Sequence, residues 1–288
     1  MKGLVLAMVV VLMAGCASHP ADNEGKEAPL SPEQQFKTGE SLRLSGNYAD
    51  ALASYVPLTK RDDEWGLKAK LAIARMALDD GKNAEAERAY QVILEDNPTC
   101  LDAQEGLGLT KLAQGDWKAA RRQLQIVNRQ DSGRWRTLNG LGIVADMTGA
   151  HDAAARWYGL ALDAGGERPL VINNAGYSLI MAGHYHDAEQ LLAQAVRRYP
   201  TESRLRHNLA ISQARQRHYD QAIRTWQVGT GKADAISNAG YIALVNGDLD
   251  KAKALLEQAK SISTRYMPRT EANLEAVKAA LAERQSGH

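Results

Sequence analysis

Two histidines and an aspartate, His184, His186 and Asp187, stand close together and could contribute ligands to a metal ion. Imidazole and carboxylate groups bind zinc when about three or four of them converge on one point. The sequence offers no distant cysteine or histidine to complete the set, and polar residues are typical of the turn and helix start expected here. We therefore expect no metal and no cofactor.

Two glycine-rich segments could hold the phosphates of a nucleotide. Residues 140–145 match a relaxed dinucleotide-binding fingerprint, and residues 229–233 partly match a P-loop. The first segment lacks a preceding strand, and the second has Trp226 and Ala233 where a P-loop requires Gly and Ser or Thr. The carboxylates are scattered and no nucleophile motif occurs, so we expect no catalytic residues and no enzymatic activity.

A cysteine follows an apolar run near the amino terminus. The run from Leu4 to Met13 is shorter than the roughly 20 residues that span a bilayer, and it is typical of a bacterial secretory signal. It leads into residues 13–16, Met-Ala-Gly-Cys, which resemble a lipobox. We predict that residues 1–15 are a cleaved signal peptide and that Cys16 carries the lipid. The alternative is an ordinary signal peptide in which Cys16 is incidental.

Lipidation would fix the location of the chain. Several acyl chains on Cys16 anchor a protein almost permanently, because each buried methylene contributes about 0.8 kcal/mol. Residue 17 is Ala rather than Asp, which in lipoproteins of diderm bacteria implies the outer membrane, facing the periplasm. Residues 16–31 are polar, contain two prolines and no aromatic residue, and are predicted to be a flexible tether.

The composition favours a helical globular chain without a basic surface for nucleic acid. The 288 residues carry a net charge of +1, and 44% are hydrophobic and 24% charged, which excludes wholesale disorder. Glycine occurs 24 times and phenylalanine once, which favours packed helices over a β-sandwich. The two cysteines exclude a disulfide scaffold, and Cys100 is interpreted as a small residue at a repeat junction.

Small residues recur with a period close to 34. Glycines occupy one phase at positions 81, 115, 149 and 183, and alanines another at 86, 120, 154, 188 and 222. A second small position and a following aromatic or leucine position recur in seven copies. The small position comprises Gly39, Ala74, Gly108, Gly142, Gly176, Ala210 and Gly240; the large one comprises Tyr55, Tyr90, Leu124, Tyr158, Leu192, Trp226 and Leu256. This period predicts stacked units of one supersecondary motif.

These residues resemble the tetratricopeptide repeat (TPR), in which each unit is an antiparallel pair of helices. The resemblance implies an all-α superhelical solenoid over residues 32–266, and residues 267–288 are expected to cap it with one more helix. Units are expected at about 32–65, 67–100, 101–134, 135–168, 169–202, 203–236 and 233–266. A side chain larger than Gly or Ala where the two helices cross would overpack, at a cost of about 1–3 kcal/mol.

Three positions depart from the repeat. Pro57 is expected to shorten or bend the second helix of the first unit. Arg217 stands where other units have the glycine that ends a helix, so its turn is expected to differ or to be strained. Residues 229–231, Gly-Thr-Gly, are expected to end the second helix of the sixth unit early.

First-helix side chains line the concave face of such a solenoid, and this face is the predicted partner-binding groove. By register its exposed positions are Asn139, Ile143, Asn173, Tyr177, Ile180, Arg204, His207, Ile211, Ser237, Tyr241 and Leu244. Tyr177 and Tyr241 are candidate anchors for an extended segment or a helix, although any of these residues could instead pack between helices. The arginines between 197 and 217 are either a solvated face or a site for an acidic partner.

Segments 173–179 and 237–241, together with the lipobox and a closing helix, resemble TadD, the TPR lipoprotein family of tight-adherence (Flp) pilus systems. The resemblance implies an outer-membrane factor that binds a pilus secretin, or another pilus assembly subunit, in the manner of a pilotin. The alternative is a general envelope scaffold that recruits peptidoglycan hydrolases or proteases. Neither alternative predicts nucleic-acid binding.

Overall fold

The computed structural model describes residues 30–286, and these form fifteen α-helices and one short 3-10 helix without a strand. The first helices are α1 (Pro32–Leu44), α2 (Tyr48–Tyr55), η1 (Leu58–Lys60), α3 (Glu64–Asp79), α4 (Asn83–Asp96), α5 (Leu101–Ala113), α6 (Trp117–Gln130) and α7 (Trp135–Met147). The remainder are α8 (His151–Asp163), α9 (Pro169–Met181), α10 (Tyr185–Arg198), α11 (Ser203–Arg215), α12 (Tyr219–Gln227), α13 (Lys232–Val245), α14 (Leu249–Ile262) and α15 (Pro268–Ser286). The all-α solenoid expected from the repeat is confirmed.

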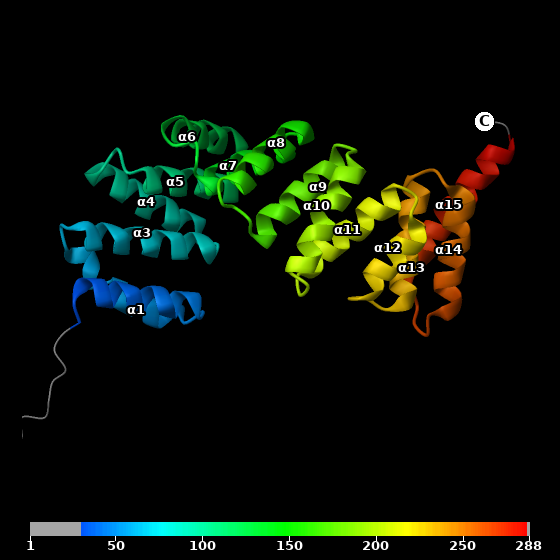
Figure 1. The fold of residues 1–288 in the computed structure, drawn as a ribbon, viewed down its shortest axis with the longest axis horizontal. Helices are drawn as coiled ribbons and strands as arrows, with labels where there is room; N and C mark the ends of the chain where they lie inside the picture. The colour runs from blue at the N-terminus through cyan, green and yellow to red at the C-terminus, as the bar shows by residue number, and fades with distance from the viewer. Residues whose placement is uncertain (1–29, 287–288) are drawn as a thin grey trace, which may run out of the picture.

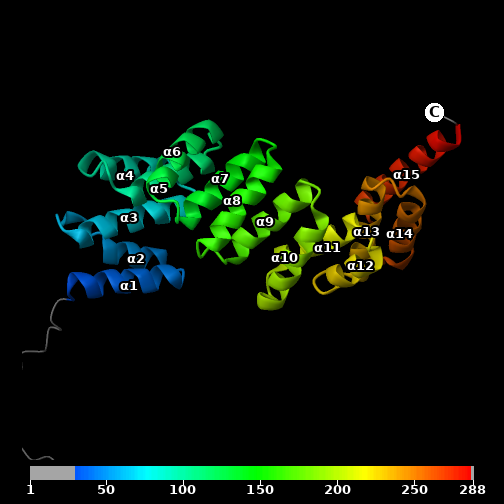
Figure 2. The same cartoon turned by 45° about the horizontal axis from the view of Figure 1, so that its top comes forward.

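The helices follow one another in space in the order of the chain. Figure 1 shows an elongated array with α1 at one end and α15 at the other, and the turned view in Figure 2 shows the same order. Most buried apolar side chains of residues 30–286 belong to six clusters, each shared by neighbouring helices. Stability is therefore distributed along the array rather than concentrated in one core.

The repeated small residues lie where the two helices of a unit cross. The alanines at 86, 120, 154, 188 and 222 are completely buried. A Cβ atom on Gly176 of α9 would lie 2.7 Å from Cδ2 of Leu192 on α10, closer than side-chain atoms approach one another. The glycine thus permits the contact between the two helices, and the large residue fills the space.

The recurring turn between the two helices of a unit requires a left-handed residue. Gly183 has φ +86°, its N–H donates to the carbonyl of Ile180, and the N–H of His184 donates to the carbonyl of Leu179. Together these bonds satisfy the last carbonyls of α9 in the manner of a Schellman motif. Arg217 adopts the same turn with φ +66°, so the expected strain is present but the turn geometry is unchanged.

The other two departures have the expected effects. α2 ends at Tyr55, two residues before Pro57, and a 3-10 turn follows. α12 has only 9 residues, because the chain leaves the helix before Gly229. Both short helices still form the second helix of their unit, and the next unit follows in each case.

The last helix, α15, packs on the final unit. Its Leu274 and Val277 are buried in one cluster with Leu255 and Leu256 of α14. The hydroxyl groups of Ser237 on α13 and Thr270 on α15 lie 2.7 Å apart and share a buried hydrogen bond. Between residues 30 and 286, no helix is both long and apolar enough to cross a membrane.

Candidate partner-binding groove

Asparagines tie the first helices of neighbouring units together along the predicted groove. The amide of Asn174 on α9 donates to Oδ1 of Asn139 on α7 at 3.2 Å. The amide of Asn208 on α11 donates to Oδ1 of Asn173 on α9 at 3.0 Å. These bonds fix the register of α7, α9 and α11, which carry all of the predicted groove residues except Ser237, Tyr241 and Leu244 of α13.

Four of the predicted groove residues meet in one cavity. Asn173 and Tyr177 of α9 line it together with Arg204 and His207 of α11, and its volume is about 610 Å³. Tyr177 is 46% exposed, so its ring is available to a bound molecule. Ser203, Arg206, Asn208, Trp226, Gly229 and Thr230 complete the lining. We call this cavity the central pocket.

The central pocket is cationic and holds a neutral histidine. No carboxylate lines it, and Arg204 has no ion-pair partner among residues 30–286. The indole N–H of Trp226 donates to Nδ1 of His207 at 3.0 Å, which requires that nitrogen to be unprotonated. Desolvation by the surrounding wall lowers the pKa of His207, since burial disfavours the charged imidazolium. Arg206 donates to the carbonyl of Pro200.

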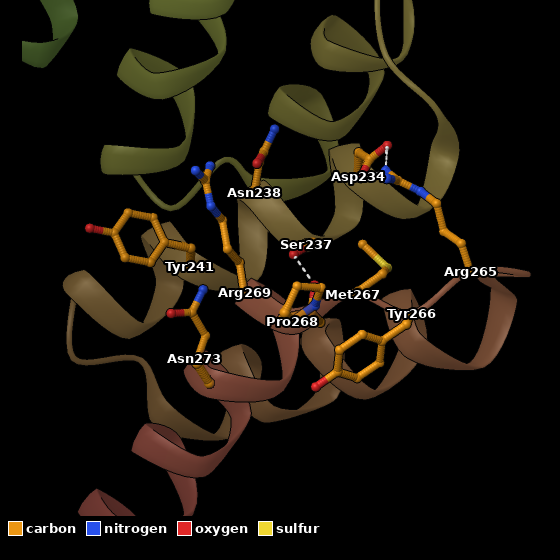
Figure 3. A pocket seen from close by; sticks show the side chains of 12 residues that line it. Asp234, Ser237, Asn238, Tyr241, Arg265, Tyr266, Met267, Pro268, Arg269 and Asn273 are labelled. Atoms are coloured by element: carbon orange, nitrogen blue, oxygen red, sulfur yellow. Dashed lines mark hydrogen bonds and ion pairs between the residues drawn. The ribbon is translucent and has the colours of Figure 1, made fainter.

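A second cavity of about 610 Å³ lies between α13 and the start of α15; we call it the C-terminal pocket. Figure 3 shows Tyr241 and Tyr266 on opposite sides of it, with Arg269 between Tyr241 and Asn238. Tyr241 is 48% exposed and Tyr266 is 73% exposed. Asp234 and Arg265 form an ion pair at its rim, with a shortest distance of 2.6 Å. Two aromatic side chains and a guanidinium are therefore presented to solvent.

Several residues predicted to be exposed in the groove are covered instead. Ile180 is only 8% exposed, because it packs against Leu192 and Leu209, so its predicted exposure is wrong. The same correction applies to Asn139 and Ser237, whose polar groups are used in hydrogen bonds between neighbouring helices. Partial burial against apolar clusters is found for Ile143, Ile211 and Leu244.

Other pocket residues had not been predicted from the sequence. Trp226 and Thr230 enter the central pocket from the end of α12. The loop that contains Arg265 and Tyr266 forms one wall of the C-terminal pocket. The predicted groove residues all lie on first helices, whereas in the structure the shortened second helix α12 and an inter-helix loop also line the pockets. The sequence signal that could have placed Thr230 in the pocket is the Gly-Thr-Gly segment at 229–231, which ends α12 early.

The basic stretch from 197 to 217 does not form one patch. Arg198 pairs with Glu167, and Arg217 pairs with Asp248 at 3.1 Å. Of this stretch, Arg204 and Arg206 line the central pocket. The arginines are therefore divided between several surfaces, and a site for an acidic partner would use only some of them.

The remaining residues that the sequence offered for metal or nucleotide binding are engaged in hydrogen bonds or in helix packing. Nε2 of His184 lies 2.9 Å from Oδ1 of Asp152, and Nε2 of His186 lies 2.8 Å from Nε2 of Gln190. The part of the chain that the structure describes contains no cluster of three metal-binding side chains. Gly140 lies inside α7, where a Cβ would meet Leu124 at 2.8 Å. Cys100 is half-buried beside α5. Cys16 lies outside the described residues.

Comparison with known proteins agrees with the repeat. The tetratricopeptide repeat family matches residues 36–99, 71–124, 105–169 and 173–227. Cellulose synthase operon protein C of Escherichia coli O157:H7 is 29% identical over 149 residues, which are 51% of this chain and 12% of that protein. The chain therefore spans about one eighth of the length of this relative.

Solved structures share the fold. PilF of Pseudomonas aeruginosa is 19% identical with a TM-score of 0.53, over 74% of this chain and 97% of that one. The TPR protein TTC0263 of Thermus thermophilus is 19% identical with a TM-score of 0.54, over 63% of this chain and 98% of that one. Arrays of this kind are scaffolds for protein–protein interaction. With its helix pairs and their recurring small residues, the chain belongs to the tetratricopeptide repeat family.

Proposed function

We propose that this protein is an outer-membrane lipoprotein that binds a pilus secretin, or another pilus assembly subunit, and thereby helps to assemble a tight-adherence (Flp) pilus. Lipid on Cys16 fixes the location, residues 16–31 give reach, and the concave groove holds the partner. The lipobox-like sequence and the resemblance of residues 173–179 and 237–241 to TadD support this proposal.

The observation that carries the proposal is the convergence of Tyr177, Arg204 and His207 in the central pocket. Exposed aromatic side chains and arginines are the residue types that most often dominate the energy of protein interfaces. Tyr241 stands at the equivalent position two units further along and borders the C-terminal pocket. An extended segment that lies along α9, α11 and α13 can therefore place one side chain in each pocket.

The lipid and the groove are tested separately. Cys16→Ala should move the protein away from the outer membrane and deplete secretin multimers. In the chain that keeps Cys16, Tyr177→Ala combined with Arg204→Ala should deplete the multimers while leaving the location unchanged. Leu160→Ala is the matched control, because Leu160 is 50% exposed on the second helix α8.

The outcomes separate the proposal from its alternative. Normal secretin multimers in both the Cys16 variant and the groove variant would contradict a role in secretin assembly. Co-purification of peptidoglycan hydrolases or proteases, with pili unaffected, would instead support the general envelope scaffold.

A further inference from the structure

A group of arginines surrounds Trp135 at the start of α7, apart from the two pockets. The guanidinium carbon of Arg136 lies 5.0 Å from the centre of the Trp135 ring, and that of Arg168, just before α9, lies 4.6 Å from it. Stacking on an aromatic ring holds the plane of a guanidinium while its N–H edges remain free. We call Trp135, Arg136, Arg168 and the nearby Arg75 of α3 the Trp135 cluster.

The arginines of the Trp135 cluster lack the partners that a neighbouring arginine has. Arg134 pairs with both Asp102 and Glu105. Among residues 30–286, no carboxylate lies within ion-pair distance of the three cluster arginines. Glu105 is already used, since it also accepts hydrogen bonds from the backbone N–H and the hydroxyl of Thr137.

The surroundings of Arg136 disfavour its positive charge. Burial lowers the pKa of Arg136, and the charges of Arg75 and Arg168 lower it further, while Glu105 and Asp79 act in the opposite direction. A half-buried guanidinium beside two like charges raises the free energy of the fold, because desolvation and repulsion both oppose it. A bound anion would remove this cost, and clusters of this kind are characteristic of binding sites.

We propose that the Trp135 cluster binds carboxylate groups of an acidic segment of the protein partner. Carboxylates match the fork of guanidinium N–H groups and can be held by two parallel hydrogen bonds. Arg168 directly precedes α9, which carries Asn173 and Tyr177. One segment can therefore place acidic residues at the Trp135 cluster and the following residues in the central pocket. This inference rests on the proposed function only in requiring a protein partner in the groove.

The first test compares Arg136→Met with Arg134→Met in the purified full-length lipidated protein in detergent. If Arg136 serves a ligand, its replacement should leave the melting temperature unchanged or raise it by about 2 °C or more, because a disfavoured charge is removed. Arg134→Met should lower the melting temperature, since it leaves the buried carboxylate of Glu105 without its ion-pair partner. A loss of stability in Arg136→Met as large as that in Arg134→Met would show that Arg136 is structural and would overturn the proposal.

The second test measures binding directly. The probes are a fluorescein-labelled peptide of alternating Glu and Leu and its Gln counterpart, titrated with the same protein and followed by fluorescence anisotropy. The Glu peptide should bind at least tenfold more tightly, and Arg136→Met combined with Arg168→Gln should abolish that preference. Equal binding of the two peptides, or an unchanged preference in the variant, would overturn the proposal. The proposal would also be overturned if inorganic phosphate raised the melting temperature of the protein as much as the Glu peptide does.

These assays use no secretin, so their failure is distinguishable from failure of the proposed function. If the Glu peptide binds through the Trp135 cluster while Cys16→Ala leaves secretin multimers intact, the secretin role fails and the acidic-segment site stands. If secretin multimers depend on Cys16 and Tyr177 while the two peptides bind equally, the acidic-segment site fails and the secretin role stands.

Discussion

A Cβ atom on Gly142 of α7 would lie 2.5 Å from Cε1 of Tyr158 on α8. Tyr158 is 1% exposed, and its hydroxyl donates to Asp146 at 2.9 Å, so the ring is fixed at both ends. The helices of this unit can therefore approach as they do only while position 142 has no side chain. Equivalent close contacts occur in four other units, at Gly39, Gly108, Gly176 and Gly240, whereas the remaining two units have Ala74 and Ala210 at this position.

Gly142→Ala should lower the free energy of unfolding by about 1–3 kcal/mol, because the ring of Tyr158 cannot move away from the added methyl group. Gly159→Ala is the matched control, since Gly159 lies inside α8 and an added Cβ would meet nothing within 4 Å. It should raise stability by about 0.5–1 kcal/mol, because alanine loses less backbone freedom on folding. Urea denaturation of both variants tests the pair, and a stabilised Gly142→Ala would contradict the packing described here.

The recurrence of small residues was enough to predict the fold. Gly81, Gly115, Gly149 and Gly183 all have positive φ, and the alanines in the second phase are fully buried. Both features are local, because each depends on contacts within one unit or with its direct neighbour. A periodic sequence therefore specifies this kind of architecture almost completely.

The groove was less predictable, because exposure depends on how neighbouring units rotate against one another. Tyr177 and Ile180 are close on α9, yet Tyr177 is exposed while Ile180 packs against Leu192 and Leu209. Trp226 is the large repeat residue of its unit, and its indole N–H donates to His207 on the first helix of the same unit. The period predicts that Trp226 packs inside its unit, but it does not predict which edge of the ring borders a pocket.

Arg217→Gly should be more stable than Arg217→Ala by about 1 kcal/mol, because the two variants differ in the free-energy cost of the left-handed backbone conformation at this position. Both variants remove the exposed ion pair with Asp248, so the comparison isolates the backbone. At φ +66° an alanine has the same unfavourable left-handed conformation as the arginine, whereas glycine adopts it freely. Thermal denaturation of the two variants provides the measurement. Equal stability would mean that the turn stores no strain.

Stability at alkaline pH should depend on Tyr90. Burial raises the pKa of its phenol to about 12, while the phenol of an unfolded chain titrates near 10. The fold favours the neutral phenol of Tyr90. The stability that this preference contributes is fully present below pH 10 and is lost as the pH rises to 12. Tyr90→Phe should lose less stability than the natural chain between these pH values, by on the order of 2–3 kcal/mol. Chemical denaturation at pH 8 and pH 12 tests this, and parallel losses would contradict it.

Acid should act on the central pocket through His207. Desolvation holds the pKa of His207 below its usual value, so the fold favours the neutral ring. Its contribution to stability is present above pH 6.5 and is lost as the pH falls through the lower pKa of the folded state. Protonation would also remove the acceptor for the Trp226 N–H. His207→Gln should therefore weaken the fall in stability between pH 7.5 and pH 5, as measured by urea denaturation. NMR titration of the His207 ring should give a pKa below 6.5, and a higher value would refute the assignment.

The central claim is that the concave groove holds the protein partner, and site-specific photocrosslinking in intact cells tests it most directly. A photoreactive phenylalanine analogue replaces Tyr177 in the groove, or Leu160 on α8 as the control, in the chain that keeps Cys16. We expect position 177 to crosslink to a pilus secretin or another pilus subunit and position 160 not to do so. Crosslinks to that partner from position 160 alone, or from neither position, would contradict it.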